Sequence, residues 1–143
     1  MRIRLRHLRI GAQTFTWRAV IGHLPGNGDC HRWIRVRVWG AGKTSQALQA
    51  DLLSVTGPSP WSACATDGGY PTPSDVRAIV DYALTVGWRP AARGGTFVLS
   101  EREHAARFSL PGFILTDRKH SPEAADPTAR VKSAYEARAR SLR

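Results

Sequence analysis

The chain has 143 residues, which is enough for one domain with a single hydrophobic core. Hydrophobic residues make up 42% and charged residues 22% of the sequence, a balance that excludes wholesale disorder. Because 21 Lys and Arg face 11 Asp and Glu, the formal net charge is +10, and the protein attracts polyanions at low salt.

Alternation of polar and apolar residues predicts strands in the first half of the chain. Residues 1–6 alternate, with Arg2 and Arg4 on one face and apolar side chains on the other. Residues 14–21 alternate in the same way. Residues 32–39 show the clearest pattern, because an isoleucine and two valines occupy every second position. We therefore expect three strands before residue 40.

The next stretch, GAGKT at residues 40–44, looks like the end of a phosphate-binding loop. A complete loop needs a glycine where Arg37 stands, and it must open a helix whose N-terminus faces the phosphates. Residues 45–53 fit either a helix or a strand. Because the glycines suit a hairpin turn, we favour a turn that exposes Lys43. Nucleotide binding through GAGKT is a remote alternative.

The second half of the chain begins with a loop and a helix. Residues 57–73 are rich in Gly, Pro, Ser and Asp and predict an ordered loop, with Trp61 as an anchor into the core. A helix over Pro73–Val86 is predicted to begin at the N-cap Thr72 and to end at Gly87. Its expected core-facing residues are Val76, Ile79, Val80, Ala83 and Leu84.

Shorter elements follow this helix. Residues 94–99 predict a turn into a strand, and Ser100 begins a capping box for a short helix through about Arg107. Residues 113–115 form a short apolar segment. The tail, capped by Asp126, has a helical composition but only a thin apolar stripe, so it is expected to pack against a partner or to fray in isolation.

Together these elements predict an α+β fold, in which a mainly antiparallel sheet from the N-terminal half is packed by one central helix. A short C-terminal helix completes the fold. We expect residues 1–116 to form a single domain, residues 117–126 to form a linker, and residues 127–143 to form a basic C-terminal helix or tail.

The candidate binding surface is the polar face of the strand over residues 32–39. Two tryptophans flank two arginines there, and a neighbouring arginine-bearing strand would extend the basic surface. Such a surface can stack unpaired bases and neutralise phosphates, so nucleic acid is the favoured partner. The residues expected to bind a polyanion or a partner are Arg2, Arg4, Arg18, Trp33, Arg35, Arg37, Trp39 and Lys43.

Three alternatives compete with this hypothesis. In the first, the arginines only cover the tryptophan rings through cation–π contacts. In the second, the helix over Pro73–Val86 packs on this face and buries the tryptophans. In the third, the same face or the tail docks on an acidic protein, as in an inhibitor, an immunity-type protein or an assembly subunit, because Trp and Arg are enriched in interfaces.

Catalytic and metal-binding patterns are weak. The histidines have no paired ligand spacing, and no GxSxG or HExxH pattern occurs. We therefore expect a non-catalytic protein without a cofactor or metal. No apolar run reaches the ~20 residues of a membrane helix, and residues 1–6 lack a secretory signal. We expect a cytoplasmic location, no membrane partner, and two free thiols at Cys30 and Cys64.

Overall fold

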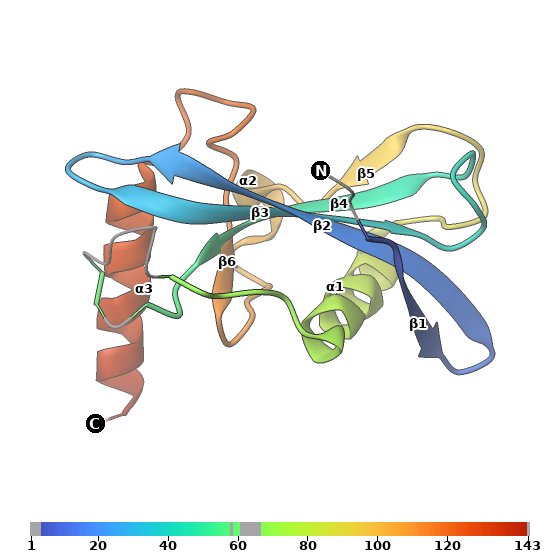
Figure 1. Ribbon diagram of the computed structural model, residues 1–143, viewed down its shortest axis with the longest axis horizontal. Helices are drawn as coiled ribbons and strands as arrows, with labels where there is room; N and C mark the ends of the chain where they lie inside the picture. The colour runs from blue at the N-terminus through green and yellow to red at the C-terminus, as the bar shows by residue number, and fades with distance from the viewer. Residues whose placement is uncertain (1–3, 58, 61–66, 143) are drawn as a thin grey trace. The chain divides into compact units, whose positions relative to one another are not determined.

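The computed structural model of the protein describes residues 4–57, 59–60 and 67–142. The described residues form six strands in one sheet together with three helices, which confirms the predicted α+β class (Figure 1). The elements are β1 (Arg6–Ile10), β2 (Gln13–Pro25), β3 (Cys30–Trp39), β4 (Ala47–Ser54), α1 (Pro73–Val86), β5 (Thr96–Val98), α2 (Glu101–His104), β6 (Phe113–Leu115) and α3 (Pro127–Ser141).

The strands are ordered β1-β2-β3-β4-β5, and β6 also pairs with β4. The chain separates into two compact units, and β2, β3 and β4 contribute residues to both. Unit 1 comprises Met1–Val20, Arg35–Ala50 and Pro71–Leu99. Unit 2 comprises Ile21–Ile34, Asp51–Tyr70 and Ser100–Arg143.

In unit 1, β1 and β2 form an antiparallel hairpin whose register runs from Arg6 opposite Trp17 to Ile10 opposite Gln13. Two residues connect the strands, and the first of them, Gly11, has a φ of 60° that glycine adopts without strain. With this turn β1 begins at Arg6, so of the described part of the predicted strand over residues 1–6 only Arg6 lies in a strand, and the prediction is wrong for residues 4 and 5. The sequence reasoning missed the turn that determines the register.

The helix α1 has the predicted bounds. The Thr72 side chain accepts a hydrogen bond from the Asp75 backbone N–H, and the Asp75 carboxylate accepts one from the Thr72 N–H, which makes a capping box. Gly87 ends the helix with a φ of 121°. Four of the five predicted core residues are buried, but Leu84 is 42% exposed, so its placement in the core was wrong.

The core of unit 1 lies on one face of its strands. Trp88, which follows the C-cap Gly87 of α1, places its ring 5.8 Å from the ring of Phe15 on β2. Because side chains alternate along a strand, Trp17 shares the face of Phe15, and Arg18 lies on the opposite face. Phe15, Trp17 and Trp88 are all at most 2% exposed. The strand face that carries Arg18 is therefore the one opposite this core.

Unit 2 has its own hydrophobic core, in which β2, β3, β4 and α3 meet. Its buried members are Leu24, Trp33, Leu53, Val55 and Val131. The end of β4 pairs antiparallel with β6, as Leu52 lies opposite Leu115. The helix α3 begins at the predicted cap, because the Asp126 carboxylate accepts a hydrogen bond from the Ala129 backbone N–H.

Residues 40–44 form part of the connection between β3 and β4, as the hairpin prediction required. The backbone carbonyl of Gly42 accepts hydrogen bonds from both the N–H and the hydroxyl of Ser45, and Gly42 has a φ of 87°. Strand β4 follows this turn. A phosphate-binding loop requires a helix at this point, whereas this chain forms a strand there.

Cys30 is disulfide-bonded, so the expectation that it is a free thiol was wrong. That expectation rested on an assumed reducing compartment, and sequence spacing alone does not reveal pairing. Cys64 and the predicted anchor Trp61 lie outside the described residues. In the part of the chain that the structure describes, no helix is long and apolar enough to cross a membrane.

Candidate functional site

The two units differ sharply in charge. Unit 1 contains eleven Lys and Arg and two Asp and Glu, a balance of +9, whereas unit 2 contains ten and nine, a balance of +1. Nearly all of the net charge of +10 therefore belongs to unit 1. A polyanion is attracted chiefly to that unit, since unit 2 is close to neutral.

Both acidic residues of unit 1 belong to α1 and have local partners. Asp75 closes the capping box at the start of the helix. Asp81 lies 3.8 Å from the Nε atom of Arg77, one helical turn away. The strand segments of unit 1 consequently contain no Asp or Glu, although β4 continues beyond this unit with the buried Asp51.

Two arginines share one tryptophan ring on this sheet. The guanidinium carbon of Arg18 on β2 lies 5.5 Å from the ring centroid of Trp39, and that of Arg37 on β3 lies 5.6 Å from it. Trp39 itself is only 7% exposed, whereas both arginine side chains remain partly exposed. We call Arg18, Arg35, Arg37 and Trp39 the arginine face.

The positive charges of the arginine face repel one another. Burial lowers the pKa of Arg37 from its ordinary value, and the charges of Arg18 and Arg35 lower this pKa further. One Nη atom of Arg37 donates to the Thr96 hydroxyl on β5 at 3.2 Å. The Nε atoms of Arg18 and Arg37 are buried without a hydrogen-bond partner. The face therefore brings the like charges of Arg18, Arg35 and Arg37 close together.

The predicted stacking platform of two open indoles is not present. Trp33 is 6% exposed and belongs to the core cluster of unit 2, where the Lys119 ammonium lies 5.0 Å from its ring centroid. Trp39 is covered by arginines, as the cation–π alternative proposed. The second alternative predicted that the helix α1 would bury the tryptophans. Trp33 instead belongs to a core cluster that includes Val131 of α3.

The structure does not unite the other predicted site residues with this face. Arg2 lies outside the described residues, and Arg4 is exposed on the segment before β1. Lys43 is exposed in the turn between β3 and β4. Of the eight candidates, Arg18, Arg35, Arg37 and Trp39 thus form the group that the structure connects.

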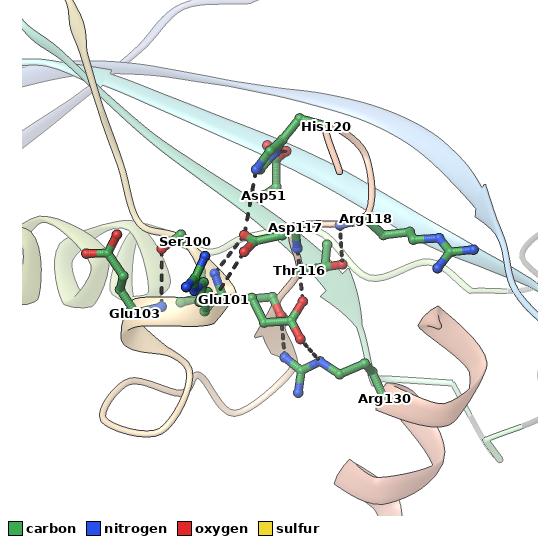
Figure 2. A network of polar contacts seen from close by, with 11 residues as sticks. Asp51, Ser100, Glu101, Glu103, Thr116, Asp117, Arg118, His120 and Arg130 are labelled. Carbon is green, nitrogen blue, oxygen red and sulfur yellow. Dashed lines mark hydrogen bonds and ion pairs between the residues drawn. The ribbon is translucent and has the colours of Figure 1, made fainter. Parts of the chain in front are cut away.

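A second polar cluster lies in unit 2 and joins α2 to the residues around β6 (Figure 2). The Asp117 carboxylate accepts hydrogen bonds from the backbone N–H groups of Glu101 and Arg102, at 2.7 and 3.2 Å. In return, the Glu101 carboxylate accepts one from the Asp117 N–H at 3.0 Å. This reciprocal arrangement satisfies the first N–H groups of α2, so its evident role is structural.

Arg130 and His120 extend the same cluster. The Arg130 Nε atom lies 3.0 Å from a Glu101 carboxylate oxygen in a direction unsuited to a hydrogen bond, so the contact is an ion pair. Arg130 also donates to the Leu115 carbonyl. The two ring nitrogens of His120 lie 3.8 and 3.9 Å from carboxylate oxygens of Asp51 and Asp117. These contacts connect α3, β4 and α2 to one another.

A third polar feature is the buried histidine His31 in unit 2. The His31 Nε2 atom and the Thr128 hydroxyl are 2.8 Å apart and hydrogen-bonded. Burial lowers the pKa of His31 from its ordinary value, and this effect outweighs the opposing influence of Asp29, Asp126 and Asp67. His31 therefore serves as a neutral link between β3 and α3.

Within the described residues, no group of three or more His, Cys, Asp or Glu side chains is arranged to hold a metal ion. No family model, curated protein or solved structure matches this chain. The arginine face and the charge of unit 1 are the features that suggest a function for this chain.

Sequence reasoning found the arginine face only in part. The alternation in β3 placed Arg35, Arg37 and Trp39 together, because a period of two fixes the face of each side chain. The contacts of Thr96 with Arg37, and of Lys119 with Trp33, were missed. Each joins segments more than fifty residues apart, and no local pattern signals such pairs.

Proposed function

We propose that this protein is a non-catalytic binding protein whose arginine face engages a polyanion, with nucleic acid as the intended partner. The observation that carries this proposal is the +9 charge balance of unit 1, whose strand segments contain no Asp or Glu. Arginines are suited to phosphate because the planar guanidinium donates several hydrogen bonds in a fixed fork.

The proposed binding mode relies on phosphate contacts and not on base stacking. Trp33 and Trp39 are buried, so the arginines would make the contacts and Trp39 would support them. Contacts to phosphate carry no direct sequence information, and we therefore expect weak sequence preference. Affinity should fall steeply with added salt, since each neutralised phosphate releases counterions.

The proposal is tested by titrating a fluorescent single-stranded oligonucleotide and a matched duplex with purified protein across a salt series. The test variant is Arg35→Gln/Arg37→Gln. The control is Lys132→Gln/Arg140→Gln, which removes the same charge from exposed positions of α3 in unit 2. Both variants are first checked for native circular dichroism and unfolding midpoint.

We expect the test variant to bind the duplex more weakly, with a salt slope that is shallower by about 2 in log K against log salt. The control variant should keep nearly the wild-type slope, because its charges lie in the nearly neutral unit. Equal losses in the two variants would mean that only the total charge matters. Unchanged affinity in a folded test variant would contradict the proposal that the arginine face binds the polyanion.

A protein-interaction module is the second candidate. It is favoured by α3, whose C-cap residue Leu142 is 87% exposed, and by an adjoining groove of about 320 Å³ in unit 2. Val55, Leu110, Ile114 and Ala134 contribute apolar side chains to this groove. A stoichiometric second polypeptide after gentle purification would favour an acidic protein partner, whereas nuclease-sensitive absorbance at 260 nm would favour nucleic acid.

A further inference from the structure

We propose that Arg18 and Arg37 form a defined clamp for one phosphate group, and that Trp39 is the positioning residue that holds the two guanidinium groups in place. This inference rests on the proposed function and deepens it. The proposed function requires only that the basic unit attracts a polyanion. The clamp requires in addition that one phosphate occupies a specific place between two named side chains.

The first support is the shared ring. The two guanidinium carbons lie 5.5 and 5.6 Å from the same Trp39 centroid, although Arg18 and Arg37 belong to neighbouring strands. A cation over an indole face is attracted by the ring, and the attraction grows as water is excluded. Because Trp39 is 7% exposed, its ring is a fixed support and not a mobile side chain.

The second support concerns which N–H groups of the two arginines can donate hydrogen bonds to a ligand. Their Nε atoms are buried and have no hydrogen-bond partner, so the Nε–H groups do not serve an external ligand. One Nη atom of Arg37 is anchored to the Thr96 hydroxyl at 3.2 Å. The remaining Nη groups therefore carry the available donors, and the anchored stems reduce the side-chain entropy that ligand binding must remove.

The third support is electrostatic. Arg18 and Arg35 are close enough to disfavour the charge on Arg37, yet arginine stays protonated at any ordinary pH. This repulsion arises among strand segments of unit 1 that contain no Asp or Glu. An anion with several acceptor oxygens relieves it by accepting hydrogen bonds from both guanidinium groups. Phosphate meets this requirement, whether it is free or part of a nucleic-acid backbone.

The experiment uses the full chain labelled with ¹⁵N and follows the side-chain Nε–H resonances of Arg18 and Arg37. Inorganic phosphate is titrated against sodium chloride at matched ionic strength. Because both Nε–H groups are covered, their exchange with water should be slow enough for observation. We expect phosphate, and not chloride, to shift both resonances along one saturable curve.

Two sets of variants separate a clamp from diffuse attraction. Arg18→Lys/Arg37→Lys keeps the net charge but loses the planar fork, and the clamp predicts at least about fivefold weaker phosphate binding. Trp39→Leu should weaken phosphate binding as well, and Trp39→Phe should restore part of it, since phenylalanine retains a smaller cation–π surface. The lysine variant keeps the buried tryptophan, so it stays informative if Trp39→Leu does not fold.

The outcomes distinguish the two proposals. Equal shifts with phosphate and chloride, or undiminished phosphate affinity in the folded lysine variant, would overturn the clamp. Oligonucleotide binding that persists in that variant at wild-type strength would also overturn the clamp while leaving the proposed function standing. Saturable phosphate binding at Arg18 and Arg37, without any binding of oligonucleotides at physiological salt, would support the clamp and contradict nucleic acid as the partner.

Discussion

At the scale of single residues, Trp33 and Trp39 show how similar burial serves different purposes. Both belong to β3, and both are less than a tenth exposed. Trp33 belongs to the hydrophobic core of unit 2, whereas Trp39 supports two arginines in unit 1. Replacing the first should therefore affect mainly stability, and replacing the second should also affect anion binding.

We predict that Trp33→Ala lowers the free energy of unfolding by about 3–5 kcal/mol, the usual range for removing a large buried aromatic side chain. Urea unfolding followed by circular dichroism measures this change. Leu142→Ala is the control, because Leu142 is 87% exposed and its removal should change the stability by no more than about 0.5 kcal/mol. A small effect at Trp33 would contradict its assignment to the core.

The protonation of His31 gives a second prediction at this scale. Burial lowers the pKa of His31 in the folded state, so the unfolded chain binds a proton that the folded chain does not. This contribution to stability is complete above the ordinary pKa of 6.5 and is lost as the pH falls through that value. We expect the unfolding free energy to decrease between about pH 8 and about pH 5.5.

Urea unfolding at several pH values in this interval measures the effect. His31→Gln should make the pH dependence shallower, because glutamine does not titrate and can still bond to Thr128. His23→Gln, at an exposed position of β2, serves as the control. An unaltered pH dependence in the His31 variant would show that the acid sensitivity originates elsewhere.

At the scale of elements, the parts with strong local signals were predicted well. The bounds of α1 followed from Thr72, Pro73 and Gly87, because these residues satisfy the ends of a helix by local chemistry. The hairpin reading of residues 40–44 was also confirmed. The turn at Gly11 was missed, and with it the position of β1.

The capping box of α1 supplies a test at this scale. Thr72→Ala removes the hydroxyl that accepts a hydrogen bond from the Asp75 N–H, so we expect a loss of about 0.5–2 kcal/mol in unfolding free energy. Thr85→Ala on the exposed side of the same helix should change it by less than about 0.5 kcal/mol. Denaturant titrations that give equal losses would contradict the capping role.

The candidate site was only partly accessible to sequence reasoning. The alternation in β3 predicted which arginines share a face, since this follows from backbone geometry. It did not predict that the tryptophans would be buried, because Trp33 packs in a core cluster with Val131 of α3 and Trp39 is contacted by Arg18 of β2. Contacts between distant segments are decided by tertiary packing, which local periodicity does not encode.

At the scale of the whole molecule, the distribution of charge is the feature on which the proposed function depends. One unit holds a balance of +9 and the other a balance of +1, although the two contain similar numbers of basic residues. The difference arises because nine of the eleven acidic residues belong to unit 2, where several of them close helix ends and ion pairs. Unit 1 thus contains nine more basic than acidic residues.

The most direct test of this account is a map of backbone amide chemical-shift changes when a short duplex oligonucleotide is added near physiological salt. The account predicts saturable changes concentrated in unit 1, on β2 and β3 around Arg18, Arg35 and Arg37. Changes concentrated on α3, or no saturable change at that salt concentration, would contradict the claim that the arginine face binds nucleic acid.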